Sequence, residues 1–163
     1  MLVSADRNGR FCQQVQQEQS CLPAERRSWA VEIVDLTQEH CNILGDPELG
    51  VFLGDFAFCA LYNGMPVAAG GIAEPYWSGR GHAWFAKKED GFNRRWWPTV
   101  TAAVRDAADR GLSSGKFRRI EMTVNDNDEK AKKWAVRLGF HPEAKCAKLM
   151  QTGEDGWIYA RTE

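Results

Sequence analysis

The stretch Arg118–Pro142, RRIEMTVNDNDEKAKKWAVRLGFHP, decides the fold prediction because its hydrophobic period changes once along its length. Ile120, Met122 and Val124 alternate with polar residues, which is the pattern of a β-strand with one buried face. Farther on, apolar residues recur at i, i+3, i+4 and i+7, the spacing of one helical face: Ala131, Trp134, Ala135 and Leu138. The stretch therefore predicts a strand followed by a helix.

A cluster of Asn and Asp residues, Asn125–Asp128, separates these two elements. Short polar side chains accept hydrogen bonds from the free N–H groups of a first helical turn, so the cluster predicts a turn and a helix start. Asp126 and Glu129 have the spacing of a capping box. Gly139 falls where a left-handed residue ends a helix, and Phe140 begins the next extended segment.

The other segments predict further strands and two more helices. Asn63-Gly64 between two apolar runs predicts a type I′ hairpin turn, and Gly70-Gly71 predicts a bulge or a close backbone approach. Helices are expected to begin at Thr37 and Pro98, and Gly111 is expected to end the second one. The remaining strands are expected at Trp29–Leu36, Phe56–Tyr62, Pro66–Ile72, His82–Ala86, Ala144–Met150 and Trp157–Arg161.

Size and composition limit the function classes. The 163 residues and 18.4 kDa fit one domain, and a net charge of -1 gives no general attraction to nucleic acid or to anionic membranes. No apolar run approaches the roughly 20 residues of a membrane helix, and Met1–Arg10 has no signal-peptide core. Five cysteines without a CxxC pair predict free thiols in a reducing compartment rather than a zinc site or disulfides. We therefore expect a cytoplasmic protein without metal, nucleic-acid or membrane partners.

The N-terminal segment Met1–Arg27 is polar and weakly patterned, so we expect it to be an arm outside a domain that spans residues 28–163. An ordered polar arm would need a partner, either another protein or a second copy of the chain. Seven tryptophans are many for this length, and an exposed cluster of them would mark an interface. The arm and the Trp-rich loop around Trp96 and Trp97 are therefore the expected contact regions.

The strand, the Asn-rich turn and the helix ending in Leu138-Gly139-Phe140 resemble the C-terminal half of the GNAT acetyltransferase superfamily. The predicted element order extends this resemblance over Ser28–Arg161. It implies a single α/β (α+β) domain with a mixed, mostly antiparallel sheet flanked by helices. Within the superfamily, the Ala-Trp-Phe strand at Ala83–Phe85 and the strand at Arg118–Met122 look most like small GNAT-like proteins of tailed phages. That finer resemblance implies a location in the host cytoplasm or the virion.

The resemblance implies that acetyl-CoA binds in a gap between the fourth and fifth strands, with its pyrophosphate on the N-terminus of the next helix. Arg94 and Arg95 are the expected phosphate ligands. The family's glycine-rich phosphate loop is replaced here by Trp96, Trp97 and Pro98, which are bulky or lack an N–H donor. The bulky side chains are expected to obstruct the phosphates, and Trp96 and Trp97 either belong to the core or a subunit interface or stack on the adenine.

Other cofactor contacts follow from the same resemblance. Backbone N–H groups near Phe85 and Ala86 are expected to stabilise the developing oxyanion. Asn125 and Asn127 either cap the helix or contact the pantetheine. The tyrosine that often acts as general acid in the family falls on Ala135, which cannot donate a proton.

The general base has two main candidates, Glu74 and His82, with Glu89 and Glu121 as further ones near the expected gap. The alternatives are a solvated strand end for Glu74 and a structural histidine for His82. We predict an N-acetyltransferase acting on an unknown amine. The alternative is a catalytically degenerate structural or assembly protein, such as a minor phage virion component. A small inhibitor or toxin-type protein is a third reading that the sequence does not separate from these.

Overall fold

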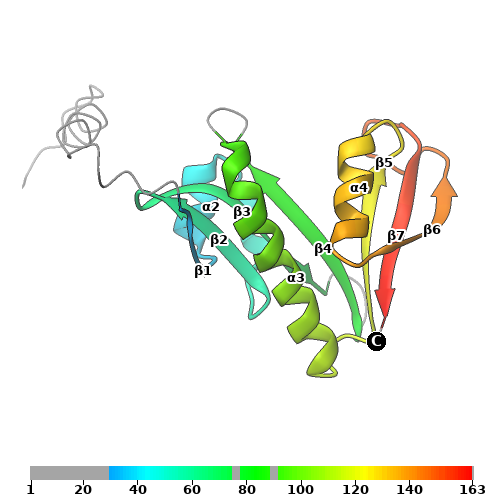
Figure 1. Cartoon of the computed structure of the whole chain (residues 1–163), viewed down its shortest axis with the longest axis horizontal. Coiled ribbons are helices and arrows are strands. Elements are labelled where there is room, and N and C mark those ends of the chain that lie inside the picture. The colour runs from blue at the N-terminus through cyan, green and yellow to red at the C-terminus, as the bar shows by residue number, and fades with distance from the viewer. Residues whose placement is uncertain (1–29, 75–77, 89–91, 163) are drawn as a thin grey trace, which may run out of the picture.

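The computed structural model describes residues 30–74, 78–88 and 92–162. Within them, seven strands form a single sheet of order β1-β2-β3-β4-β5-β7-β6, in which β4 and β5 are parallel and the other neighbours antiparallel (Figure 1). The strands are β1 Glu32–Asp35, β2 Ala57–Tyr62, β3 Met65–Ala73, β4 Arg80–Lys87, β5 Arg119–Asn125, β6 His141–Cys146 and β7 Gly156–Thr162. The helices are α2 Gln38–Leu44, η2 Pro47–Phe52, η3 Arg94–Trp96, α3 Trp97–Ser113 and α4 Glu129–Arg137.

Helices cover both faces of the sheet. On one face, α3 and α4 bury Val104 and Leu138 against Ile120 and Val124 of β5, in the larger core cluster. On the other face, α2 and η2 cover β2 and β3, where Cys41 belongs to a second cluster. Successive β2 residues alternate between the two clusters, as the pleat of a strand requires. Figure 1 shows α3 and α4 in front of the sheet, with α2 beside the β1–β3 half.

The hairpin between β2 and β3 confirms the turn prediction. Asn63 and Gly64 have φ angles of 51° and 75°, the left-handed values that a type I′ turn needs at both positions. Gly71 makes the expected close approach, because a Cβ there would lie 2.3 Å from the carbonyl oxygen of Phe56. The bulge itself lies elsewhere on β3, because Ala60 pairs with Ala68 and Leu61 with Pro66, which leaves Val67 as the extra residue.

The start of α2 also follows the sequence prediction. The Thr37 side chain accepts a hydrogen bond from the His40 N–H, and the His40 ring accepts one from the Thr37 N–H. This reciprocal capping box fixes the helix start. Gly45, with φ 85°, ends the helix, and Pro47 then opens η2.

The predicted end of α3 is wrong. Gly111 lies inside the helix, which continues to Ser113. The reason for a glycine at this position is packing, because a Cβ would lie 2.7 Å from the Phe117 ring. Phe117 is almost fully buried, so this contact sits in the core between α3 and the start of β5.

The predicted capping box of α4 is wrong as well. Asp128 is the N-cap residue, and its side chain accepts hydrogen bonds from the N–H groups of Lys130 and Ala131. Asp126 instead contacts side chains from other elements, as described below. At the other end, Gly139 has φ 89° and follows the last turn, as predicted.

The strand β6 begins earlier than predicted. It starts at His141, directly after the left-handed Gly139 turns the chain, and it ends at Cys146. Lys148 has φ 52°, which interrupts the extended backbone before Met150. The predicted arm Met1–Arg27 lies outside the described residues.

Candidate functional site

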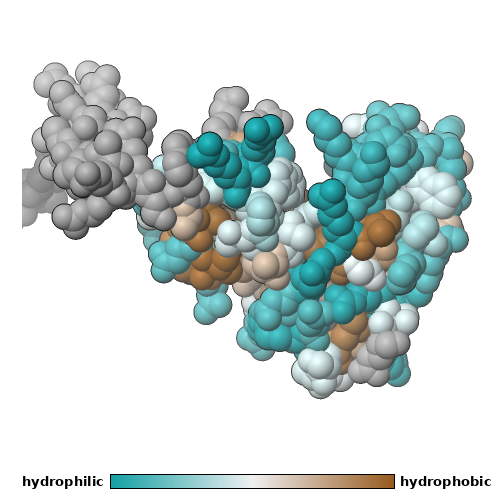
Figure 2. All heavy atoms as spheres, viewed as in Figure 1, coloured by the Kyte–Doolittle hydropathy of each residue, from teal (hydrophilic) through white to brown (hydrophobic). Residues whose placement is uncertain are grey.

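The central feature of the sheet is the place where β4 and β5 separate. The two strands pair only over Arg80–His82 and Arg119–Glu121, and His82 opposite Glu121 is the last pair. Beyond that point both strands continue without pairing to each other, and Figure 1 shows them spreading apart. Figure 2 shows a notch in the surface between the two halves of the molecule on the side where the strands spread. The gap expected from the sequence resemblance is therefore present.

Backbone direction decides which β4 amides face this gap. The Lys88 N–H donates to the Val67 carbonyl of β3 at 3.0 Å. Since donors alternate along an antiparallel strand, the Ala86 N–H also points to β3, and those of Phe85 and Lys87 point to the β5 side. Of the two amides expected to stabilise an oxyanion, the Phe85 amide has the required direction and the Ala86 amide does not.

Four aromatic rings pack against one another on the sheet face that α3 and α4 cover, and we call them the aromatic wall: Phe85, Phe92, Trp97 and Trp134. The Trp134 ring lies 5.2 Å from both Phe85 and Trp97, centroid to centroid, and its indole N–H donates to Thr101 Oγ1 at 2.9 Å. Phe92 contacts Phe85 and Trp97 edge to face. All four rings are half-buried, so each presents part of its surface to solvent.

The neighbouring Trp96 plays a different part. It is only 4% exposed, and its ring packs against Tyr62 at 4.9 Å and Phe92 at 5.6 Å. Trp96 therefore belongs to the core over β2. Of this pair, only Trp97 packs against Trp134 of α4.

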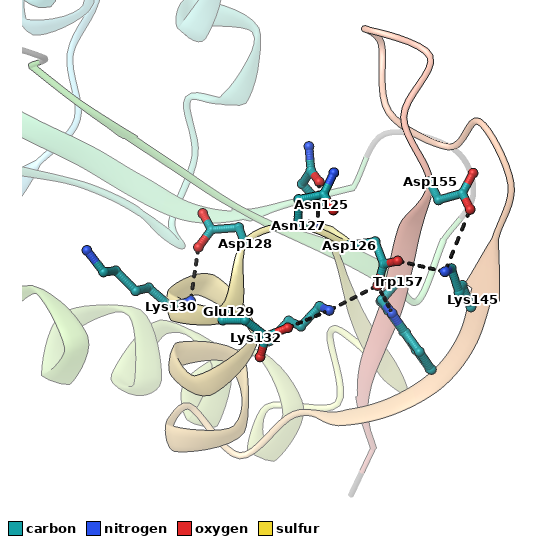
Figure 3. Close-up of polar contacts among 10 residues, drawn as sticks. All are labelled: Asn125, Asp126, Asn127, Asp128, Glu129, Lys130, Lys132, Lys145, Asp155 and Trp157. Atoms are coloured by element: carbon teal, nitrogen blue, oxygen red, sulfur yellow. Dashed lines mark hydrogen bonds and ion pairs between the residues drawn. The ribbon is translucent and has the colours of Figure 1, made fainter.

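Cationic side chains flank the gap. Arg94 and Arg95 are exposed in η3, directly before α3, where Asn93 caps the turn by accepting from the Arg95 N–H at 2.9 Å. On the opposite side, Lys130 is exposed in the first turn of α4, and Figure 3 shows its side chain extending away from the Asn125–Asp128 turn. Pro98 occupies the first turn of α3 as predicted.

The β5–α4 turn forms one wall of an open pocket of about 630 Å³. Asn125 is held in place, because its Oδ1 accepts from the Asn127 N–H at 2.8 Å and its Nδ2 donates to Glu154 at 2.5 Å. Figure 3 shows Asn125 and Asn127 on the side of the turn that faces away from Lys132. Asn127 is therefore better placed than Asn125 to contact a ligand. The residues lining the pocket are Asn125, Asn127, Asp128, Glu129 and Lys130.

Asp126 ties this turn to the terminal hairpin (Figure 3). Its carboxylate accepts hydrogen bonds from Lys132 at 2.9 Å and from the Trp157 indole at 2.7 Å, and it pairs with Lys145 at 2.6 Å. The hydrogen bonds from Lys145, Lys132 and Trp157 hold the pKa of this carboxyl well below its usual range. Asp126 thus fixes the position of the pocket wall without facing the gap.

His82 stands at the point of separation, half-buried. Burial lowers its pKa below the ordinary value, the nearby Glu121 charge opposes this effect, and Arg80 adds to it. The imidazole is therefore neutral near pH 7 and can accept a proton. His82 is three residues from Phe85, so the alternation of β4 places it on the sheet face opposite the aromatic wall.

Glu121 is buried beside His82, with 8% of the residue exposed. Both Arg80 and Arg119 donate to its carboxylate, and Arg119 also pairs with Glu143. Burial alone would raise the pKa of Glu121, but the hydrogen bonds and charges of the two arginines outweigh burial and lower it. Glu121 is thus an ionised, fully engaged group that acts on His82 through its charge.

Glu74 is also fully engaged. Its carboxylate accepts from the Gly79 N–H at 2.7 Å and from Lys116 at 2.5 Å, and the Lys116 contact is the main cause of its lowered pKa. Glu74 directly follows β3, whose last residue Ala73 pairs with His82. These contacts favour His82 over Glu74 as the base. Glu89, a further candidate, lies outside the described residues.

Several site residues were not identified from the sequence. The ring contacts of Phe92 and Trp134, and the two arginines on Glu121, depend on pairing between distant segments. The sequence did carry one signal for Trp134, which is a tryptophan at the edge of an otherwise small apolar helix face. Ala135, where the resemblance places a tyrosine, is fully buried on the inner face of α4.

The described residues contain no group of three or more His, Cys, Asp or Glu side chains that could hold a metal ion. No helix among them is long and apolar enough to cross a membrane. Cys41, Cys59 and Cys146 are unpaired thiols in this part of the chain.

Solved structures share this fold at low sequence identity. A GNAT-family acetyltransferase from Streptococcus pneumoniae aligns over 82% of this chain and 99% of its own, with a TM-score of 0.64 and 14% identity. The ribosomal-protein-S5-alanine acetyltransferase from Vibrio fischeri aligns over 66% of this chain, which spans 61% of that enzyme's length, with a TM-score of 0.55 and 17% identity. The ribosomal L7/L12 α-N-protein acetyltransferase RimL, solved with coenzyme A, aligns over 83% of this chain and 96% of its own, with a TM-score of 0.60 and 10% identity.

These likenesses show that the chain has the fold of the GNAT acetyltransferases, and they confirm the predicted fold class. No protein-family model matches the sequence, and no curated protein matches it.

Proposed function

We propose that the chain is an N-acyltransferase that moves the acetyl group of acetyl-CoA to an amine at the point where β4 and β5 separate. The observation that carries this proposal is the short pairing of the two strands, which leaves β4 with an unpaired edge beyond His82. An extended chain that bears amide groups can bind a free strand edge through backbone hydrogen bonds. The pantetheine arm of CoA is such a chain, and the amides of Phe85 and Lys87 point to the free edge where it would lie.

The charges on the two sides of the gap support binding of the CoA phosphates. Arg94 and Arg95 precede α3, and Lys130 lies in the first turn of α4. Arginine binds phosphate oxygens through two parallel N–H donors, and lysine supplies a compact charge. These side chains replace the donors that a glycine-rich loop supplies in other proteins of this fold, because Trp97 and Pro98 occupy that position.

The two faces of the sheet separate the two substrates. The aromatic wall lies on the α3 and α4 side, where the thioester would approach along β4. His82 faces the opposite side of the sheet, because side chains alternate along β4, and the amine would approach from that side. In this scheme the amine nitrogen attacks the thioester carbon, a C–N bond forms, the C–S bond breaks, and the thiolate takes a proton from water. His82 accepts the proton that the amine loses, and the Phe85 amide stabilises the oxyanion.

Glu121 is a positioning residue in this scheme. Its charge favours the protonated imidazole, so it stabilises His82 after proton transfer. Arg80 and Arg119 keep Glu121 ionised, and Glu143 holds Arg119 in place. The whole group lies at the last pairs of β4 and β5, so the sheet itself fixes the geometry.

The test is a titration with CoA by calorimetry, followed by an assay of thiol release from acetyl-CoA with polyamines and peptide N-termini as acceptors. We expect saturable CoA binding in the wild type. His82→Gln should lower kcat by about 100-fold or more, since a general base contributes about that much, and leave CoA binding unchanged. His40→Gln is the matched control, because glutamine at that position preserves the capping box of α2. Absence of heat at millimolar CoA would remove the proposal.

A second function is favoured by one observation, the contact of Trp97 and Trp134 across α3 and α4. If these rings block the thioester, the fold serves as a binding or assembly module, and the missing tyrosine at Ala135 has no consequence. A contact through the arm Met1–Arg27, as in a phage assembly protein, is the form that the sequence predicts for such a module. A truncated chain starting at Ser28 should then lose an oligomer or a partner complex that the full chain forms, as measured by light scattering.

A further inference from the structure

A second pocket, of about 580 Å³, lies between the C-terminal half of α3, the end of α4 and the adjoining ends of β6 and β7. It shares no lining residue with the pocket at the β5–α4 turn. Its size is in the range of pockets that hold a small organic ligand. Figure 2 views the face that carries α3 and α4 and shows hydrophilic surface on both helices with a small hydrophobic area between them.

Three arginines and two carboxylates line this pocket, and the carboxylates are already neutralised. Asp109 pairs with Arg161, and Glu143 pairs with Arg119, which lies outside the pocket. Arg105 and Arg137 therefore remain without a carboxylate partner among the described residues. The pocket carries two uncompensated positive charges.

The arginines are held by the backbone at the end of α4. Arg105 donates to the Arg137 carbonyl, and Arg161 donates to the Leu138 carbonyl at 3.3 Å. These bonds cover the carbonyl oxygens whose partial negative charge would otherwise repel an anion. They also leave further guanidinium N–H donors of Arg105 for a ligand, since a guanidinium has five.

An apolar side chain lies beside the charges. Val136 is 56% exposed and lines the pocket together with Arg137. A ligand that fits both features has a planar or apolar part next to a group with several acceptor oxygens. Arginine pairs with phosphate through two parallel hydrogen bonds, which makes phosphate the best match.

We infer that this pocket binds the phosphate of a small organic phosphate, with Arg105 and Arg137 on the phosphate and Val136 against the organic part. The site is separate from the gap between β4 and β5, and the inference does not depend on the proposed acyl transfer.

The test is calorimetric titration of the full chain with AMP and with inorganic phosphate at constant ionic strength. AMP should bind saturably, and Arg137→Gln should weaken AMP about tenfold, since a charged hydrogen bond contributes about that factor. The Arg137 guanidinium donates no hydrogen bond to another described residue, and its carbonyl bond with Arg105 is kept, so this variant should keep the fold. Lys133→Gln removes the same charge from an exposed position on α4 outside the pocket and should change AMP binding less than about twofold.

Three results would overturn the inference. The first is no saturation with AMP at about 10 mM, which is weaker than any useful site. The second is inorganic phosphate binding as tightly as AMP, which would leave no role for Val136. The third is loss of AMP binding in an Arg94→Gln/Arg95→Gln variant with no loss in Arg137→Gln, which would place AMP in the gap instead.

Discussion

Replacing Trp134 tests both the packing and the role of the aromatic wall. Trp134→Phe keeps a ring against Phe85 and Trp97 but removes the indole N–H bond to Thr101 at 2.9 Å. A hydrogen bond of this kind contributes about 1 kcal/mol to the free energy of unfolding. Trp134→Ala also removes two ring contacts, each of about 0.5–1.5 kcal/mol, together with the apolar area that the half-buried ring covers.

The expected loss for Trp134→Ala is therefore about 2–4 kcal/mol, whereas a fully buried tryptophan costs about 3–5 kcal/mol. For a domain of this size, that corresponds to a fall in Tm of about 4–16 °C, against about 2–4 °C for Trp134→Phe. Urea denaturation and thermal melts measure both. Lys133→Ala, at an exposed neighbouring position, is the control and should change stability by less than about 0.5 kcal/mol.

The same variants decide what the wall does. If it lines the route of the thioester, Trp134→Ala should weaken CoA binding. A gain of CoA affinity in Trp134→Ala would instead show that the indole blocks the gap, and would favour the assembly module. An unchanged Tm in Trp134→Ala would refute the packing argument itself.

Three further predictions concern the core and the separation point. Gly111→Ala should destabilise the fold by about 1–3 kcal/mol, because the added Cβ overpacks against Phe117, and this outweighs the better helix propensity of alanine. Urea denaturation measures the change, and a more stable variant would contradict the packing argument. Gly71→Ala should cost at least as much, because its Cβ would meet the Phe56 carbonyl rather than a side chain that can move, and an unchanged urea midpoint would speak against the close approach. The lowered pKa of His82 means that the unfolded chain binds more protons than the folded one at mildly acid pH. Stability should therefore fall as pH drops below about 6.5, and this pH dependence should shrink in His82→Gln, as measured by urea denaturation at pH 5 and pH 8; an identical slope in both proteins would contradict it.

Local patterns predicted most of the fold. The alternation of Ile120, Met122 and Val124, the I′ turn at Asn63-Gly64 and the helix start at Thr37 each depend on a few neighbouring residues, so the sequence displays them directly. Gly111 was wrongly predicted to end α3 because the reason for a glycine there is not local. The glycine makes room for the ring of Phe117, which comes from the loop after the helix.

The site was predictable in outline and not in detail. The resemblance predicted the separation of β4 and β5, which the structure has, whereas His82 as a base and Arg94 and Arg95 as phosphate ligands stay predictions. The engagement of Glu74 by Lys116, the burial of Glu121 and the direction of the Ala86 amide depend on which segments meet in space. The sequence showed that Trp97 stands where the resemblance places a glycine loop, but it did not show that Trp97 contacts Trp134.

Hydrogen exchange of the β4 amides, followed by NMR, tests the central claim most directly. The unpaired edge predicts fast exchange at Phe85 and Lys87, slow exchange at Trp84 and Ala86, and slower exchange at Phe85 once CoA is added. Equal protection of all four amides in the free protein, or no change at Phe85 with CoA, would contradict the account.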